Sequence, residues 1–528
     1  MQITPFTAPS PSPPDHNLFT ALRAAFPAEL ETLAIETEAG ATHSWGDIER
    51  GTARLANLFD ELALPPGSRI VAQVDKSVQA LLLYLATLRA GHVFVPLNTA
   101  YQAEEVGYFL QNAEPALVVC ASRSAAWIGE LAAAAGIAHC LTLDADGSGS
   151  LTVRAAGQSE VHRTVRRTAD DLASIIYTSG TTGRSKGAML GHGNLFANAA
   201  LLRSHWGWRP DDVLIHALPI FHVHGLFVAV HGALINGSRM IWLDRFDAAT
   251  VVRHLPRATV FMGVPTFYVR LLAEPALDRD RVRNMRLFLS GSAPLQIETF
   301  NEWTRRTGHE IVERYGMSET VMLTSNPSRP EQGRRRAGTV GPALPGVRLR
   351  IENEGGPVPA GEIGGIEVAG PSVFAGYWRM PEKTREEFTA DGFFRTGDVG
   401  RLDADGFLTI VGRSKDLIIS GGYNVYPAEI ELCLNELDGV EESAVVGVPH
   451  PDFGEVGIAL VVARAGAGPQ EGELLGRLKD RLANFKIPKR CFVVGSLPRN
   501  AMGKVQKNLL RAEHAGLFAR APAGPAER

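Results

Sequence analysis

The sequence predicts an α/β protein with a large N-terminal body and a small mobile α+β C-terminal lid. The body is expected to contain two α/β layers plus a small antiparallel β unit. Apolar runs rich in β-branched residues alternate with helical stretches, which is typical of α/β proteins; examples lie at 68–74, 116–121, 173–178, 258–264 and 286–291. After Gly338, Gly- and Pro-rich segments such as VRLRIEN, GGIEVAG and FLTIVG favour antiparallel hairpins.

The order of these patterns predicts a body over residues 1–411, with a β-rich subdomain at 338–411, and a lid over 412–528. Residues 1–14 are rich in Pro and Ser and predict an unfolded lead, and 515–528 predict a loose tail. Within the lid, Pro427 suits a first helical position, and Ile430, Leu434 and Leu437 share one face. We therefore expect a helix from Pro427 to about Leu437, followed by strands at AVVGVPH and ALVVARAGAG.

Composition excludes several classes of protein. The 528 residues are 45% hydrophobic and 21% charged, which does not fit a disordered or collagen-like chain. The 53 basic and 57 acidic residues give a net charge of −4, so no general attraction to nucleic acid is expected. The four cysteines form no CxxC pair or zinc-like cluster, which favours a reducing compartment. With no signal-like start and no run long enough to span a bilayer, we expect a soluble cytoplasmic protein.

The glycine-rich segment YTSGTTGRSKG, residues 177–187, is the most informative stretch. It follows a predicted strand, and its glycines allow a tight turn whose N–H groups can face phosphate oxygens. Hydroxyls of Ser179, Thr181 and Thr182 add donors, and Lys186 adds a compact positive charge. An ordinary surface loop would not need this combination. The spacing is not that of a Walker P-loop, so a P-loop kinase or ATPase is the weaker nucleotide-binding hypothesis.

This segment resembles the phosphate loop of the adenylate-forming superfamily, which includes acyl-CoA synthetases, luciferases and adenylation domains. Further landmarks follow in the family's order: LPIFHVHGL, SGSAPL, RYGMSET, FRTGDVG, GRSKDLIISGGYNVYP and PRNAMGKVQK. Within the family, the chain is most similar to malonyl-CoA synthetases through HALPIFHVHGL, MGVPTFY, FLSGSAPL, VGPALPGV, FAGYWRMPEKT and LPRNAMGKVQK. Gly191, where relatives often carry Ser or Thr, is a small departure.

The resemblance implies a ligase that uses ATP, Mg²⁺ and coenzyme A. A carboxylate would attack the α-phosphorus of ATP to give acyl-AMP and pyrophosphate, and the CoA thiol would then displace AMP. The attacking carboxylate is already ionised at pH 7, so the first half-reaction needs positioning and charge neutralisation rather than a general base.

The resemblance also assigns residues to ATP. Glu319 and Thr181 would hold Mg²⁺, Tyr315 would stack on adenine, and Asp398 would accept the ribose hydroxyls. Lys504 would reach from the lid to the acyl carboxylate and α-phosphate. The catalytic set is Lys504, Thr181, Glu319 and His222, and the nucleotide set is Thr178, Ser179, Gly180, Thr181, Thr182, Gly183, Lys186, Ser292, Ala293, Pro294, Arg314, Tyr315, Gly316, Met317, Ser318, Glu319, Thr320, Asp398, Arg413 and Lys504.

A dicarboxylate substrate would leave its second carboxylate inside the acyl pocket, where a cation or several donors must meet it. The expected pocket comprises His222, Val223, Arg286, Ser290, Met322 and Arg335. Arg286, Arg314 and Arg335 are the candidate charge partners. Arg286 could equally be a structural arginine at the edge of a strand, and Arg335 could belong to a solvated run of basic residues. His222 and His224 could equally pack in the core. Methylmalonate differs by one methyl group, which a pocket discriminates only modestly.

One lid position cannot hold Lys504 in the site and also admit a thiol. The family's solution implies rotation about Lys415, after which Gly421, Gly422 and Tyr423 would line the pantetheine tunnel. The alternatives are a CoA ligase for another short-chain or aromatic acid, a kinase or ATPase, and a non-catalytic acyl-adenylate-binding protein. We expect small-molecule partners, no nucleic acid, no membrane span, and a monomer or weak homo-oligomer.

Overall fold

The computed structural model describes residues 15–178, 185–353, 355–421, 423–479, 481–500 and 503–518. The predicted lead at 1–14 and most of the predicted tail therefore lie outside the described residues. So do five predicted nucleotide contacts and one predicted tunnel residue, namely Ser179, Gly180, Thr181, Thr182, Gly183 and Gly422.

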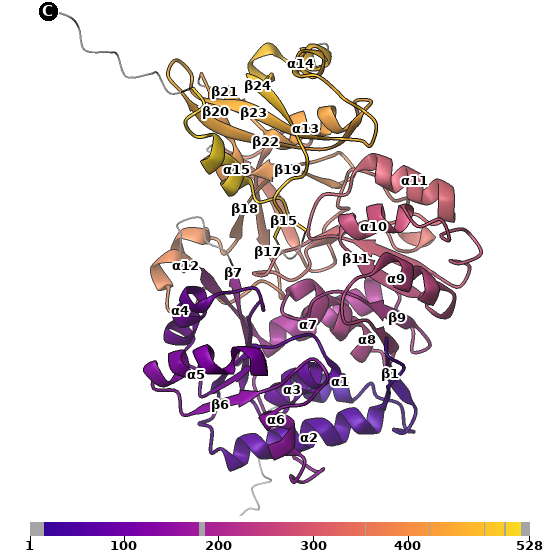
Figure 1. The fold of residues 1–528 in the computed structure, drawn as a ribbon, viewed down its shortest axis with the longest axis vertical. Coiled ribbons are helices and arrows are strands. Elements are labelled where there is room, and N and C mark those ends of the chain that lie inside the picture. Colours follow the sequence, from indigo (N-terminus) through magenta and orange to yellow (C-terminus); the bar gives the residue numbers. More distant parts are fainter. Residues whose placement is uncertain are drawn as a thin grey trace, which may run out of the picture.

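A six-stranded sheet forms the first layer of the body, in the lower part of Figure 1. Its strands are parallel except for the last pair, and their order is β6 (His139–Thr142), β5 (Leu117–Cys120), β3 (Arg69–Gln73), β4 (Val93–Pro96), β7 (Leu172–Thr178) and β8 (Lys186–Gly191). The helices of this part of the chain are α2 (Trp45–Glu61), α3 (Val78–Arg89), α4 (Ala103–Ala113), η1 (Ser122–Ser124), α5 (Ala125–Ala134) and α6 (Ser150–Ala155).

An eight-stranded sheet forms the second layer. It is parallel except at its two edges, in the order β14 (Thr324–Ser325), β13 (Val312–Tyr315), β12 (Leu287–Ser290), β11 (Val260–Gly263), β9 (Val213–His216), β10 (Arg239–Trp242), β1 (Leu33–Thr37) and β2 (Thr42–Ser44). Its helices are α1 (Leu18–Arg23), α7 (His192–His205), the π-helix η2 (His224–Val230), α8 (His231–Leu234), α9 (Ala248–His254), η3 (Leu255–Arg257), α10 (Pro265–Leu272), α11 (Ile297–Thr307) and η4 (Pro330–Gln332).

The two layers share one hydrophobic core. Helix α3 is buried along almost its whole length, and the same cluster of side chains includes Ile70 of β3 and Leu214 of β9. The five apolar runs predicted as strands are confirmed, because they coincide with β3, β5, β7, β11 and β12 to within two residues at each end. Continuous apolar runs of this kind are expected where helices cover a parallel sheet on both faces.

A third, antiparallel sheet confirms the hairpins predicted after Gly338. Its order is β16 (Gly356–Pro357), β15 (Arg348–Asn353), β17 (Gly364–Ala369), β18 (Phe394–Leu402) and β19 (Leu408–Arg413). The short helix α12 (Pro381–Glu387) precedes β18. In Figure 1 this sheet lies between the two larger sheets and the C-terminal part of the chain.

The residues after β19 form a separate small sheet at the top of Figure 1. It contains β20 (Ile418–Ser420), β21 (Tyr423–Val425), β22 (Val440–His450), β23 (Gly454–Ala463) and β24 (Arg490–Val494), with η5 (Ser414–Asp416), α13 (Pro427–Asn435), α14 (Glu471–Lys479), η6 (Asn484–Lys486) and α15 (Lys507–His514). We call residues 414–518 the lid. The predicted helix begins at Pro427 as expected but ends two residues before Leu437.

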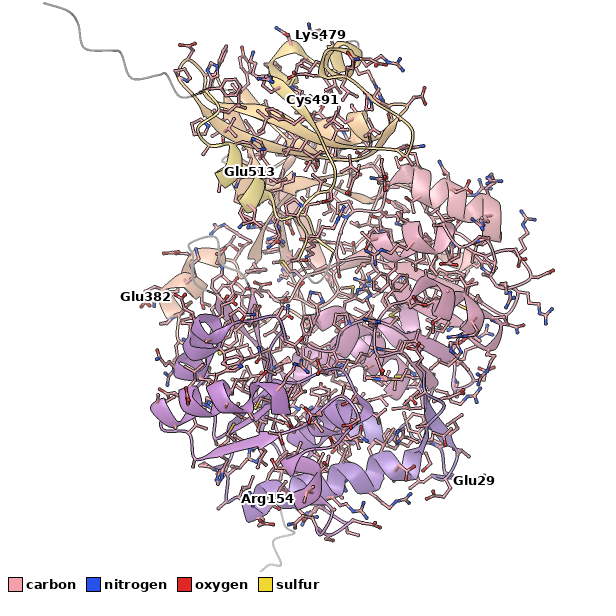
Figure 2. The ribbon with its side chains drawn as sticks, viewed as in Figure 1. Glu29, Arg154, Glu382, Lys479, Cys491 and Glu513 are labelled. Carbon is pink, nitrogen blue, oxygen red and sulfur yellow. The ribbon has the colours of Figure 1, made fainter. Side chains whose placement is uncertain are left out.

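Figure 2 shows side chains filling the space between the ribbons. Labelled charged residues such as Glu29, Arg154 and Glu513 are exposed, whereas Cys491 is buried in the lid. Within the described residues, no helix has both the length and the apolar character required to cross a membrane.

Candidate active site

The predicted site residues gather where strands from three sheets end. Thr178 is the last residue of β7, Ser290 the last of β12 and Tyr315 the last of β13. In the antiparallel sheet, Asp398 of β18 pairs directly with Arg413 of β19. The carboxyl ends of parallel strands are where open α/β sheets bind ligands, because loops and helix N-termini converge there.

Glu319 is a buried carboxylate fixed by neighbouring hydroxyls. Its Oε1 accepts hydrogen bonds from Tyr377 at 3.1 Å and from Thr178 Oγ1 at 3.4 Å. Burial raises the pKa of Glu319 above its usual value, while the Tyr377 bond and the positive charge of Lys186 oppose that rise. Lys186 itself lies 4.2 Å from the centre of the Tyr377 ring and contacts Glu387 at 3.3 Å.

The Glu319 carboxylate fits a magnesium ion that is held mainly by the phosphates of a nucleotide. No group of three or more His, Cys, Asp or Glu side chains in the described part of the chain could hold a metal on its own. Mg²⁺ commonly binds through one or two carboxylates together with substrate phosphates. Glu319 would supply the carboxylate, and the predicted second ligand, Thr181, lies outside the described residues.

Asp398 forms the centre of a second anchored group. Its Oδ2 accepts a hydrogen bond from the Tyr315 hydroxyl at 2.5 Å, and its Oδ1 lies 2.8 Å from Arg413 Nε. The negative charge of Asp398 raises the pKa of Arg413. Burial, followed by the charge of Asp398, raises the pKa of Tyr315 well above its usual value. The arrangement holds the Asp398 carboxylate in one orientation at the end of the β18–β19 hairpin.

The lid delivers Lys504 to these body residues. Four charged groups of the body influence its pKa, namely Arg413, Asp398, Glu319 and Arg314. Water still reaches the Lys504 side chain, yet the protein atoms around it reduce its hydration, so burial is the main cause of its lowered pKa and Arg413 the next. The Lys504 loop also comes near α10, since a β-carbon added to Gly503 would lie 3.1 Å from Thr266 Oγ1.

The loop before the π-helix η2 places two histidines beside the loop after β12. The His224 amide donates to His222 Nδ1 at 3.1 Å, and His224 Nδ1 lies 3.3 Å from Ser292 Oγ. Burial lowers the pKa of His222 to about 3, and the charges of Lys504 and Arg314 act in the same direction. His222 is therefore neutral near pH 7, with Nδ1 as an acceptor and Nε2–H available as a donor.

Apolar and small polar groups accompany these histidines. Val223 and Met322 are each 3% exposed, and Ser290 is fully buried with a hydroxyl that has no hydrogen-bond partner among the described residues. Ser292 and Val321 adopt positive φ angles of 72° and 57°. Such backbone conformations are costly for residues other than Gly and cluster at functional sites.

The remaining predicted nucleotide contacts lie in the two loops that follow β12 and β13. In the first loop, Ala293 is half-buried and Pro294 is exposed. In the second, Gly316, Met317 and Ser318 are half-buried and Thr320 is fully buried. The amides of Thr320 and Val321 both donate to the Met317 carbonyl, so this loop is a compact turn that leads into buried Glu319.

The three arginines considered for the acyl pocket have different surroundings. Arg286 lies before β12, at the end opposite Ser290, and is paired with the buried Asp212. Arg335 donates to the carbonyls of Pro327, Glu310 and Ser328. The structure therefore does not bring Arg286 or Arg335 to the pocket, because each is already bound elsewhere. Arg314 is 2% exposed and influences the pKa of both His222 and His224.

The predicted hinge residue and the two described tunnel residues, Lys415, Gly421 and Tyr423, are all exposed. Lys415 is exposed in the short helix η5. Gly421 adopts φ +57° and its amide bonds to the Phe453 carbonyl at 2.9 Å. Tyr423 is 59% exposed and stacks on Phe485 with ring centres 4.7 Å apart. In this lid position, Lys504 faces the body while Tyr423 is in contact with solvent.

The sequence interpretation missed Tyr377 and Thr266. Tyr377 donates a hydrogen bond to Glu319, and the only feature of the sequence that pointed to it was its place in the family-like segment FAGYWRMPEKT. Thr266, in MGVPTFY, lies close to the Lys504 loop. Arg270 lies one helical turn further along α10 and is exposed. Both segments had been recognised as similar to the family, but no pattern within them distinguished these side chains.

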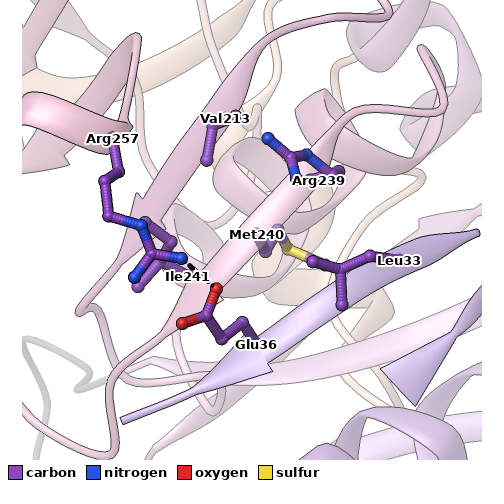
Figure 3. A pocket seen from close by; sticks show the side chains of 7 residues that line it. All are labelled: Leu33, Glu36, Val213, Arg239, Met240, Ile241 and Arg257. Carbon is purple, nitrogen blue, oxygen red and sulfur yellow. Dashed lines mark hydrogen bonds and ion pairs between the residues drawn. The ribbon is translucent and has the colours of Figure 1, made fainter. Parts of the chain in front are cut away.

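A separate cavity of about 300 Å³ lies beside β1 and β10 and is lined by Leu33, Glu36, Val213, Arg239, Met240, Ile241 and Arg257. An ion pair between Arg257 and Glu36 lies within it (Figure 3). None of the predicted site residues lines this cavity. The convergence of charged side chains at the strand ends, rather than the size of a cavity, therefore identifies the candidate site.

Comparison with known proteins extends these observations. The family described as AMP-binding enzyme matches residues 23–378, and the AMP-binding enzyme C-terminal domain matches residues 429–504. The malonate–CoA ligase of Arabidopsis thaliana is 34% identical over 545 aligned residues, covering 94% of this chain and 89% of that protein.

Solved structures of MatB from Rhodopseudomonas palustris are 52% identical and cover 96% of this chain and 100% of theirs. The TM-score is 0.92 for the ATP-bound crystal structure and 0.82 for the apo crystal structure. The arrangement described above is thus more similar to the ATP-bound form.

Proposed function

The chain belongs to the AMP-binding enzyme family, and within it we propose that the protein is an ATP-dependent, AMP-forming ligase that joins malonate to coenzyme A. The observation that carries this proposal is the position of Lys504, which the lid places among Glu319, Asp398 and Arg413 of the body. Similarity to malonate–CoA ligases over almost the whole chain supports malonate as the acid.

In the first half-reaction, one malonate carboxylate attacks the α-phosphorus and pyrophosphate leaves. Lys504 would neutralise charge between the acyl carboxylate and the α-phosphate, and Asp398 would hold the ribose through its two oxygens. Mg²⁺, when bound through Glu319, would reduce the repulsion between the two anions. No base is required, because the malonate carboxylate is already ionised at pH 7, and His222, with a pKa lowered to about 3, would be only a weak proton acceptor.

In the second half-reaction, the CoA thiol attacks malonyl-AMP and AMP leaves. Lys504 would have to withdraw, because it would occupy the space that the thiol must enter. We propose that the lid turns about Lys415 and brings the exposed surface near Gly421 and Tyr423 to the body. Gly421 and Gly422 have no side chains, which would allow pantetheine to approach the backbone closely.

The test is a product assay with purified protein, ATP, Mg²⁺, CoA and a series of acids. Malonate should give malonyl-CoA, AMP and pyrophosphate, far faster than acetate, octanoate or coumarate does. Methylmalonate should react more slowly than malonate by no more than about 10–200-fold, which is the usual discrimination that a pocket achieves against one methyl group. Release of ADP would contradict the proposal, and a preference for an aromatic or longer acid would support the alternative ligase.

We also propose a cellular compartment and an oligomeric state for the protein. All four cysteines are free in the structure, in keeping with the expected reducing, cytoplasmic environment. A monomer or weak homo-oligomer remains the expected state, and size-exclusion chromatography coupled to light scattering would test it.

A further inference from the structure

His216 is a buried histidine at the base of the loop that carries His222. It is the last residue of β9 and is 1% exposed. Its Nε2 lies 3.0 Å from the carbonyl oxygen of Gly225, which belongs to the π-helix η2. A carbonyl oxygen can only accept, so Nε2 carries a proton and donates this hydrogen bond. The bond therefore joins the two ends of the loop over residues 217–224.

The protonation state of His216 suits this contact. Burial lowers the pKa of His216 well below its usual value, and the charge of Lys76 acts in the same direction, while the bond to Gly225 opposes both. The other ring nitrogen, Nδ1, makes no hydrogen bond within the described residues. His216 is therefore a neutral ring near pH 7, and its one proton lies on the nitrogen that faces Gly225.

Trp242 fixes the plane of the His216 ring. The two residues are direct neighbours on the parallel strands β9 and β10, and their rings stack with centres 4.6 Å apart and planes inclined by 13°. Trp242 is fully buried. The imidazole is thus held between the sheet and η2 in the orientation that the bond to Gly225 requires.

Lys76 reaches this group from the other layer of the body. It lies between β3 and α3, and its amino group donates to the carbonyl of His216 at 2.8 Å and to that of Leu243. The same nitrogen lies 4.5 Å from the centre of the Trp242 ring. Burial lowers the pKa of Lys76 well below its usual value, and Asp244 opposes this. Charged or neutral, the amino group has protons for both carbonyls, so it ties the ends of β9 and β10 together.

The far end of the loop is packed too closely to move by itself. A β-carbon on Gly225 would lie 2.1 Å from the carbonyl oxygen of Pro219, and the Leu226 amide donates to the His222 carbonyl at 2.9 Å. A displacement of Gly225 would therefore displace His222 as well. π-Helical segments are rare and are frequent at functional sites, which fits a role for η2 in placing the loop.

We propose that His216 and Lys76 are positioning residues for binding of the acid: Lys76 fixes the end of β9, and His216 fixes the start of η2, so that His222 is held where the acid binds. This inference rests on the proposed ligase function and on the predicted place of His222 in the acyl pocket. His216 and Lys76 act through the loop rather than by contact with substrate. Their loss should therefore change binding of the acid and leave binding of ATP as it is.

The first test removes the donor but keeps the ring. His216→Phe can still stack on Trp242, but the buried Gly225 carbonyl loses its partner, so the KM for malonate in acid-dependent ATP–pyrophosphate exchange should rise about tenfold. The KM for ATP should not change, because the predicted nucleotide loops follow β12 and β13. His216→Gln places an amide N–H at about the reach of Nε2 and should restore the KM for malonate.

The second test starts from the other layer. Lys76→Met keeps most of the aliphatic side chain but removes the amino group, and it should raise the KM for malonate in the same way. The double variant with His216→Phe should add little to either single change, because both act through one loop. His192→Phe is the matched control: His192 is also fully buried and accepts from the Leu18 amide at 3.0 Å, so its loss should lower thermal stability without changing the KM for malonate.

The outcomes separate the two proposals. A wild-type protein that activates no acid would overturn the proposed function, and with an acid other than malonate the same KM measurements would use that acid. In an active enzyme, an unchanged KM for the acid in His216→Phe, or equal rises in the KM for the acid and for ATP, would overturn the positioning role. Failure of His216→Gln to restore the KM would do the same. Should His216→Phe not fold, Lys76→Met decides by the same criteria.

Discussion

The body and the lid contribute to the candidate active site in different ways. In the body, Glu319 is held by Tyr377 and Thr178, and Asp398 by Tyr315 and Arg413. In the lid, the Lys504 loop is closed by two hydrogen bonds with Asn500: the Lys504 amide donates to Asn500 Oδ1 at 3.0 Å, and the Lys504 carbonyl accepts from the Asn500 amide at 2.9 Å.

The difference indicates what each part must do. The body's carboxylates are oriented by side chains from several elements, so they are fixed before any ligand binds. Within the described residues, the ammonium group of Lys504 gives no hydrogen bond, so its place depends on the position of the lid. A group positioned in this way can be brought in for one half-reaction and removed for the next.

The strongest test of this comparison removes the lid's charged group. Lys504→Ala should lower acid-dependent ATP–pyrophosphate exchange by about 10²–10³-fold, because a preorganised positive charge is lost from the transition state. Thioester formation from supplied malonyl-AMP should persist. Lys507→Ala is the control, since Lys507 is a lid lysine whose charge is paired with Glu431 at 2.6 Å within the lid itself. Unimpaired exchange in Lys504→Ala would refute the assignment.

A second variant should uncouple the two half-reactions. Lys415→Pro fixes φ in η5, at the junction between β19 and the lid, and should hinder rotation. Adenylation should be preserved while thioester formation falls by at least about tenfold, as expected when a domain movement becomes limiting. Lys415→Ala removes the same side chain without restricting φ and should retain most thioester formation. Equal loss of both steps in the proline variant would argue against a hinge here.

A change on the body side should affect nucleotide binding. Asp398→Asn removes the charge that pairs with Arg413 and weakens two charge-assisted bonds, so the KM for ATP should rise by about 10–100-fold. Asp403→Asn, in the same hairpin but paired with Arg336 at the surface, should leave this KM unchanged. A similar KM for ATP in both variants would show that Asp398 does not contact the nucleotide.

Much of the fold could be predicted from local patterns. The apolar run at 173–178 predicts β7 and Pro427 predicts the start of α13, because both signals lie within a few neighbouring residues. Tyr377 could not be identified as the partner of Glu319 in this way. The two residues are far apart in the chain, and a tyrosine in a loop has no local feature that indicates its hydrogen-bond acceptor.

The amino-acid sequence alone determined the class of fold, the order of the motifs and the chemistry that Lys504, Glu319 and Asp398 can perform, because these depend on residue type and local spacing. Only the tertiary structure showed which arginines the protein itself pairs. The side chains of Arg286, Arg314 and Arg335 are chemically identical, and what separates them is whether distant segments supply an acceptor. Asp212 does so for Arg286 and three carbonyls do so for Arg335, whereas Nε and Nη2 of Arg314 make no hydrogen bond within the described residues.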